Sequence, residues 1–301
     1  MQLSVPLLRF ASSAVRVLPG PVVDGAAGLV AAGSVRLSSE QRAMAERNMR
    51  RVLGPDAAPE LIDRAVREVF DSYGRYWVDT LRLPHLGDRQ IADGFSHDGV
   101  EHLEAAMERG VGPILALPHV GGWEWAARWL VAVRGWDVTA VAEELDPPEL
   151  FEWFLGLREQ MGLHIVPLGP AAGSEVSAAL AAGRITCLLA DRDLGGTGIP
   201  VDFFGETTRL PGGPALMALR SGAALLPTAV YFEGDRCHAV VDPPLDTERR
   251  GTIRSDVSRV TQDLARAMER QIRRAPEQWH LLQPNWPSDY RALGRPVPGE
   301  A

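Results

Sequence analysis

The chain has 301 residues and a mass of 32.7 kDa, which is enough for one large domain or two small ones. Its 46% hydrophobic and 23% charged residues are typical of a soluble globular protein. The 39 acidic residues outnumber the 31 basic ones, and the net charge of −8 disfavours nucleic-acid binding through a basic surface. The sequence contains no lysine, which excludes Schiff-base chemistry and the lysine of a phosphate-binding P-loop.

The cysteines are Cys187 and Cys237, and no CxxC pair is present. This usage predicts neither a disulfide framework nor a cysteine-rich zinc site. Cys187 lies in the apolar run 185–190, which indicates a buried core thiol. We therefore expect a reducing, cytoplasmic setting.

Residues 1–36 are apolar, but arginines, Asp24 and the Pro-Gly-Pro at 19–21 interrupt them. No apolar stretch reaches the roughly 18 residues that a spanning helix needs. The first residues also lack the basic segment that opens a signal peptide. We expect two short helices broken at 19–21, lying either on the protein or in a membrane interface.

The first 94 residues predict a helical cap, with helices at 39–53 and at 59–83 that end near Gly54-Pro55 and Pro84. From residue 95 strands and helices alternate. The expected helices are at 98–109, 123–134, 147–161, 174–182, 212–221 and 257–272, and the expected strands at 112–117, 137–142, 163–168, 184–190, 224–232 and 236–242. We predict an α/β fold for one domain over 1–301. Its core, 95–301, holds a mixed, mostly parallel central sheet with helices on both faces.

A histidine follows the buried strand at 112–117. His119 stands where an α/β site places a general base, at the carboxyl end of a strand. Two glycines, Gly121 and Gly122, lead into a helix whose first turn carries Glu124, and a carboxylate on one ring nitrogen fixes the tautomer. The amino terminus of this helix also offers an anion site. A strand-end histidine that is merely capped is the alternative.

Other histidine and glycine motifs do not match. The sequence has no His-Glu-x-x-His zinc site, and no second histidine lies within one helical turn of His119. It has no Gly-x-Ser-x-Gly elbow, which disfavours a serine hydrolase of the α/β type. The glycines at 195–198 do not form a dinucleotide-binding fingerprint.

A second informative region follows the strand at 184–190. It begins with Asp191-Arg192-Asp193 and continues into a glycine-rich loop with Phe203-Phe204, after which a helix begins beyond 211–213. Such a segment suits a groove for an acyl chain, with Arg192 or Arg209 facing a phosphate. The alternative is a turn-rich loop whose phenylalanines belong to the core.

Several blocks in order resemble the bacterial lipid A biosynthesis acyltransferase family, and most closely its actinobacterial branch, which acylates phosphatidylinositol mannosides. The family's His-x4-Asp/Glu motif falls on His119 and Glu124. The other matching blocks are at 48–53 (NMRRVL), 72–77 (SYGRYW), 190–193 (ADRD), 201–206 (VDFFGE), 211–214 (PGGP) and 275–286 (APEQWHLLQPNW). The likeness covers most of the chain and implies a glycerolipid acyltransferase-like fold.

The resemblance implies a direct transfer, without a cofactor or a metal. His119 deprotonates a mannose hydroxyl, which attacks the thioester of acyl-CoA, and the chain expected in this branch is palmitoyl. The acid that orients His119 is left open between Glu124 and Asp202. The residues expected to bind substrate are Arg158 and Arg209 at phosphate, Trp123, Phe203 and Phe204 along the acyl groove, and Asp191, Arg192 and Glu206 beside them.

The resemblance also implies a peripheral or monotopic protein on the cytoplasmic face of the cell membrane. The family's lipid A branch usually begins with a spanning segment, which this sequence lacks. Arginines such as Arg9, Arg16, Arg50 and Arg51 are expected to face anionic lipid. Three alternatives stay open: a lipid or thioester hydrolase, a different glycolipid acceptor, and a lipid-binding protein without catalysis.

Overall fold

The computed structural model describes residues 39–144 and 146–299, so the helices expected within 1–36 lie outside the described residues. The first described elements are α3 (Ser39–Leu53) and α4 (Pro59–Arg82). Proline at the first position of α4 suits a helix start, where its missing N–H is not needed. Ile62, Val66, Val69 and Phe70 form one buried face of α4. The two predicted cap helices are confirmed.

Helix α4 runs along one edge of the molecule and leads through a 3₁₀ turn, η1 (Leu83–His85), into α5 (Asp88–Asp93). Its middle packs against a second 3₁₀ turn, η2 (Pro276–Gln278), from the far end of the chain. A short helix, α12 (Pro287–Ala292), follows η2 beside α3. The cap therefore holds the segment that precedes Trp279 and His280, which donate hydrogen bonds to Asp191 and to the backbone carbonyl of His119.

The central sheet has seven strands in the order β1-β9-β8-β2-β5-β3-β4. Only β8 and β9 pair antiparallel, and every other neighbouring pair is parallel. The strands are β1 (Phe95–Asp98), β2 (Ile114–Leu117), β3 (Val138–Ala142), β4 (Leu163–Pro167), β5 (Ile185–Leu189), β8 (Leu225–Glu233) and β9 (Arg236–Val241). This confirms the predicted mixed, mostly parallel sheet.

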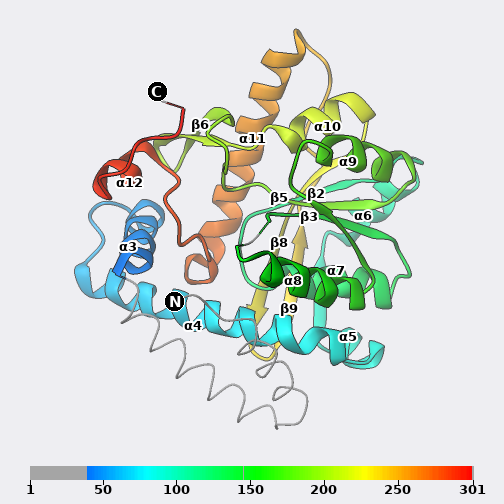
Figure 1. Cartoon of the computed structure of the whole chain (residues 1–301), viewed down its shortest axis with the longest axis horizontal. Coiled ribbons are helices and arrows are strands. Elements are labelled where there is room, and N and C mark those ends of the chain that lie inside the picture. Colours follow the sequence, from blue (N-terminus) through cyan, green and yellow to red (C-terminus); the bar gives the residue numbers. More distant parts are fainter. Residues whose placement is uncertain (1–38, 145, 300–301) are drawn as a thin grey trace.

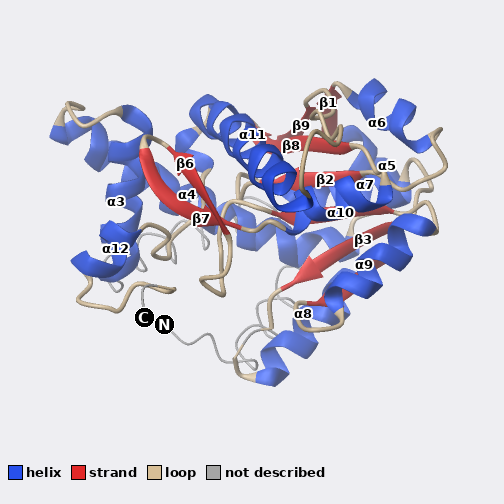
Figure 2. Cartoon of the chain, turned by 90° about the horizontal axis from the view of Figure 1, so that it is seen from above, coloured by secondary structure: helices blue, strands red, loops and turns tan. Residues whose placement is uncertain are grey.

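Helices cover both faces of the sheet (Figure 2). One core cluster unites the sheet with α9 (Ala172–Ala181), α10 (Gly213–Ser221) and α11 (Ile253–Arg274). The other lies under α6 (Val100–Met107) and α7 (Trp123–Ala132), with the end of α8 (Pro148–Gln160) beside it. Because every side chain of β2 is buried, the middle of the sheet lies inside both clusters.

Three strands, β1 and the two strands of a hairpin, were not expected from the sequence. Strand β1 has four residues, too few for an alternating pattern to show. A separate antiparallel hairpin, β6 (Ile199–Phe203) and β7 (Glu206–Leu210), replaces the expected glycine-rich loop. Its two-residue turn, Phe204 and Gly205, has φ of 54° and 75°, as tight primed hairpin turns require. Phenylalanine is rarely the first residue of such a turn, so this signal was missed.

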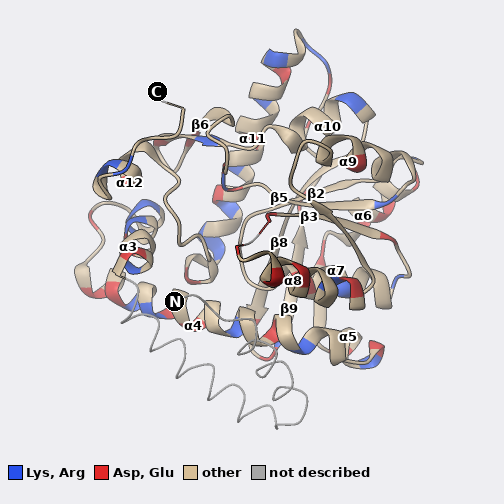
Figure 3. Cartoon of the chain, in the orientation of Figure 1, with Lys and Arg blue, Asp and Glu red and all other residues tan. Residues whose placement is uncertain are grey.

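None of the described helices is long and apolar enough to cross a membrane. Acidic and basic residues both occur along α3, α4 and α11 (Figure 3). Arg50 is exposed and pairs with Glu46 at 2.8 Å. Arg51 is not available to lipid, because its side chain is only 9% exposed and pairs with Asp289 and Glu206. The expectation for Arg51 is wrong, and Arg9 and Arg16 lie outside the described residues.

Candidate active site

His119 lies two residues beyond the carboxyl end of β2, and its side chain is 32% exposed. Its Nδ1 lies 2.6 Å from Oδ1 of Asp191, which lies two residues beyond β5. The two strands are parallel neighbours with Leu117 beside Leu189, so equal extensions bring His119 and Asp191 together. With Nδ1–H donating to the carboxylate, Nε2 is left as the proton acceptor.

Asp191 is fully buried, and both of its carboxylate oxygens are hydrogen-bonded. Its Oδ2 accepts the backbone N–H of His119 at 3.0 Å and the indole N–H of Trp279 at 2.8 Å. Burial disfavours the charged form of Asp191 and by itself would raise its pKa. The charge of the His119 imidazole and the hydrogen bonds from His119 and Trp279 favour the charged form more strongly, so the pKa of Asp191 is lowered. The group beside His119 is therefore a fixed, ionised carboxylate.

Glu124, the acid of the His-x4-Glu motif, does not hold His119. Its Oε1 accepts the Tyr76 hydroxyl at 2.8 Å and lies 3.1 Å from Nη2 of Arg158. The other proposed acid, Asp202, has an exposed side chain on β6, where its backbone pairs with the amide of Gln262. The structure gives the orienting position to Asp191, which the sequence had placed among the substrate-binding residues.

The two glycines before α7, Gly121 and Gly122, lie in close contact with neighbouring segments of the chain. A Cβ at Gly121, whose φ is 57°, would lie 2.0 Å from the carbonyl oxygen of Val230 on β8. The N–H groups of Gly121 and Gly122 donate to the carbonyls of Gln278 and Val230. These two amides are therefore used in packing the loop against η2 and β8.

A cavity of about 480 Å³ opens beside His119 at the carboxyl ends of β3 and β5. Its walls are mainly apolar, and Leu168 and Leu194 are 46% and 42% exposed there. Other apolar residues in its wall are Val141, Val176, Leu188, Pro211, Pro214 and Met217. Arg192 also lines it and pairs with Glu143 at 3.1 Å. An apolar groove with a partly exposed histidine at its wall suits a long acyl chain.

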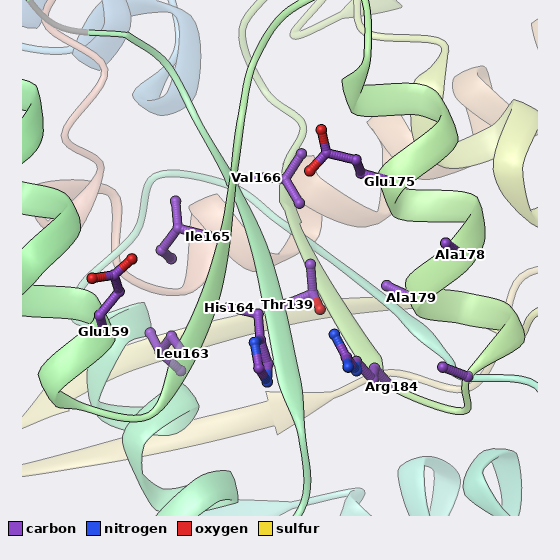
Figure 4. Close-up of a pocket in the computed structure, with 11 residues that line it drawn as sticks. Thr139, Glu159, Leu163, His164, Ile165, Val166, Glu175, Ala178, Ala179 and Arg184 are labelled. Atoms are coloured by element: carbon purple, nitrogen blue, oxygen red, sulfur yellow. The ribbon is translucent and has the colours of Figure 1, made fainter.

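A second cavity of about 480 Å³ lies over the edge strand β4 (Figure 4). Thr139, His164 and Arg184 line it near the amino ends of β3, β4 and β5, whereas His119 follows the carboxyl end of β2. Since ligands in open α/β sheets bind at the carboxyl ends, the cavity beside His119 is the candidate site.

The aromatic residues expected along the groove are core residues instead. Phe203 is fully buried and stacks on Trp286, with ring centroids 5.6 Å apart. Phe204 packs against Trp279, and Trp123 is 7% exposed. These rings are not among the residues that line the cavity. The hairpin β6–β7 turns Phe203 inward because alternate residues of a strand point to opposite faces.

The remaining predicted residues occupy different places. Arg158 is paired with Glu124, and Glu206 with Arg51. Arg209 donates to the carbonyl of Gly198 at 2.9 Å and lines a smaller cavity. Among the residues that the structure describes, no cluster of three or more His, Cys, Asp or Glu side chains is placed to hold a metal ion.

The sequence did not predict a role for Trp279 and Asn285, whose side chains donate hydrogen bonds to Asp191. The amide of Asn285 donates to the backbone carbonyl of Asp191 at 3.0 Å. Both residues lie in the block 275–286, where an indole and an amide near many apolar residues give no signal of contact with a carboxylate.

Residues 6–288 match the model of the bacterial lipid A biosynthesis acyltransferase family. The chain belongs to this family. It is 44% identical over 250 residues to a phosphatidylinositol mannoside acyltransferase of Mycobacterium tuberculosis H37Rv, covering 81% of this chain and 76% of the relative. It is 39% identical over 278 residues to the protein of that name from Mycolicibacterium smegmatis, covering 91% and 88%. The resemblance inferred from the sequence is confirmed, and this family member is an acyltransferase.

Proposed function

We propose that this acyltransferase moves a long fatty acyl group, palmitoyl in the first instance, from acyl-CoA to a mannose hydroxyl of a phosphatidylinositol mannoside. The observation that carries the proposal is the His119–Asp191 pair in the wall of an apolar groove. The names of the two relatives support this glycolipid as the acceptor.

The geometry of the His119–Asp191 pair supports a direct transfer. Nε2 of His119 takes the proton of the sugar hydroxyl as its oxygen attacks the thioester carbonyl, and Asp191 stabilises the imidazolium that forms. As the carbon–sulfur bond breaks, His119 returns the proton to the leaving thiolate. No acyl-enzyme forms, because the acceptor oxygen attacks directly. Each methylene that the groove buries contributes roughly 0.8 kcal/mol to donor binding.

Both substrates of this reaction are amphipathic, so we place the enzyme at the cytoplasmic face of the cell membrane as a peripheral protein. Co-sedimentation with vesicles that contain phosphatidylinositol tests this location, with neutral phosphatidylcholine vesicles as the control. Equal absence from both pellets would contradict it.

The deciding experiment incubates the purified protein with palmitoyl-CoA and phosphatidylinositol mannosides and analyses the lipids by mass spectrometry. We expect one added palmitoyl group, and a rate lower by roughly 10²- to 10⁴-fold in the His119→Ala variant. Release of free palmitate at full rate without acceptor would instead indicate a thioester hydrolase. Binding without turnover, equal in wild type and variant, would indicate a lipid-binding protein.

A further inference from the structure

A small cavity of about 170 Å³ lies next to the site, between the hairpin β6–β7 and the C-terminal segment after α12. Its polar side chains come from Asp193, Thr207, Thr208, Arg209, Asn285 and Tyr290, and its apolar lining includes Pro200, Pro287, Val297 and Pro298. Asp193 also lines the apolar groove beside His119, so the two cavities share a wall. The space suits one sugar ring, whose hydroxyls can meet the polar side chains while its C–H groups pack on the apolar residues.

Asn285 connects this cavity to Asp191, the carboxylate that positions His119. The residue is 7% exposed, and its amide nitrogen donates to the backbone carbonyl of Asp191. Its carbonyl oxygen, Oδ1, is buried and has no hydrogen-bond partner among residues 39–144 and 146–299. An acceptor left in this state costs free energy unless a donor reaches it.

The hydrogen-bonding groups in the cavity wall indicate which class of ligand fits. A phosphodiester has no hydrogen to give to Oδ1 of Asn285, whereas a hydroxyl does. Arg209 uses Nη1 on the Gly198 carbonyl, which leaves other N–H groups for an acceptor. The carboxylate of Asp193 already accepts the N–H groups of Gly195 and Gly198. The walls therefore combine donors at Arg209 and Tyr290 with an unpaired acceptor at Asn285, which complements a ring that carries hydroxyls.

We propose that this cavity binds a sugar ring of the acceptor, with a ring hydroxyl donating to Oδ1 of Asn285 and sugar oxygens accepting from Arg209 and the Tyr290 hydroxyl. The inference rests on the proposed function for the identity of the acceptor. It places the sugar one side chain away from Asp191, so that occupation of the cavity and the position of the carboxylate are linked through Asn285.

Two variants test the cavity without touching Asn285, which also holds Asp191. Tyr290→Phe removes one donor, and Arg209→Gln removes the guanidinium. Arg220→Gln is the matched control, because Arg220 is exposed at the end of α10 outside these cavities. Initial rates are measured with varied phosphatidylinositol mannoside at saturating palmitoyl-CoA, and the reverse. Thermal unfolding shows that each variant is folded.

We expect KM for the glycolipid to rise roughly threefold to tenfold in Tyr290→Phe and about tenfold or more in Arg209→Gln. KM for palmitoyl-CoA stays unchanged, and the control behaves as wild type. A rise in KM for palmitoyl-CoA alone would assign the cavity to the ribose of the donor and overturn the inference. Unchanged values for both substrates would also overturn it.

A binding measurement separates this inference from the proposed function. Calorimetry of the His119→Ala protein with the water-soluble, deacylated glycerophosphoinositol mannoside reports binding without turnover. If wild type acylates no glycolipid but this head group binds, and Arg209→Gln removes the binding, the sugar site stands and the proposed reaction fails. If Arg209→Gln leaves the binding intact, or the head group does not bind, the sugar site fails.

Discussion

Glu124 and Arg158 form an ion pair inside the protein, with Oε1 of Glu124 3.1 Å from Nη2 of Arg158. Tyr76 donates to the same oxygen, so the group joins α4, α7 and α8. Burial, and next the charge of Glu124, raises the pKa of Tyr76, which therefore remains a donor. The acid of the His-x4-Glu motif thus holds the helix behind His119 in place.

Removing one partner of this pair should destabilise the fold. Glu124→Leu leaves Arg158 buried without a counter-charge, and we expect the free energy of unfolding in urea to fall by roughly 3–5 kcal/mol. The double variant Glu124→Leu/Arg158→Met removes both charges and should recover most of that loss. A double variant no more stable than the single one would contradict the structural role.

Asp191→Asn should impair the reaction itself. An asparagine amide presented to Nδ1 of His119 favours the wrong tautomer, and we expect kcat to fall roughly 10²- to 10⁴-fold while KM for palmitoyl-CoA stays within about twofold. Asp202→Asn is the control, since Asp202 is exposed on β6. An equal loss of kcat in both variants would mean that Asp202 also takes part in the reaction.

The length of the acyl chain should respond to a change in the groove wall. Gly173 lies in α9, and a Cβ there would meet Cε of Met217 at 3.7 Å, an ordinary contact. Gly173→Leu fills space that roughly three methylenes would occupy, which corresponds to about 2 kcal/mol of donor binding. We expect about a thirtyfold shift in kcat/KM from palmitoyl-CoA towards shorter donors.

Gly156→Leu is the matched control for this change. Gly156 also lies within a helix, α8, and a Cβ there would meet nothing within 4 Å. Rates with a series of acyl-CoA lengths should keep the wild-type order in this variant. The same shift in both variants would mean that the cavity is not the acyl groove.

Phe203 and Leu194 should separate stability from substrate binding. Phe203→Ala opens a hole in a fully buried cluster, and we expect a loss of roughly 3–5 kcal/mol in thermal or urea unfolding. Leu194 is 42% exposed in the groove, so Leu194→Ala should change stability by less than about 0.5 kcal/mol. Its KM for palmitoyl-CoA should rise several-fold. If Phe203→Ala instead raised KM for palmitoyl-CoA and Leu194→Ala lowered stability, Phe203 would be assigned to the acyl groove.

His280 predicts a pH dependence of stability. Burial, and next the charge of His119, lowers the pKa of His280 to about 3, and its Nε2 lies 2.8 Å from Oγ of Ser72. In the unfolded chain the imidazole takes up a proton below about pH 6.5, so the unfolded state binds more protons between the two values. Stability therefore falls as the pH drops through this window.

We expect the wild type to lose roughly 2 kcal/mol more than His280→Gln between pH 7.5 and pH 5.0, measured by urea unfolding. The lost contact with Ser72 shifts the variant's stability at every pH and does not alter this difference. Parallel stability curves would show that His280 does not titrate between the folded and unfolded states.

The order of elements could be read from the sequence because it depends on local periodicity. The run 114–117 has four apolar residues in succession, and it became β2, buried on both faces. The face of α11 with Val260, Leu264, Met268 and Ile272 was likewise visible, and these residues are buried. The short strand β1 and the hairpin turn at Phe204 fell below what periodicity resolves.

The sequence by itself determined the alternation of strands and helices, the family and the position of His119 at a strand end. Only the tertiary structure decided which carboxylate faces that imidazole, because strand order is a long-range property. Glu124 is near in sequence but turns into a helix junction, while Asp191, 72 residues on, arrives beside His119 because β5 lies next to β2. Burial likewise placed Phe203 in the core and left leucines to line the groove, since a hairpin's register sets which face each side chain occupies.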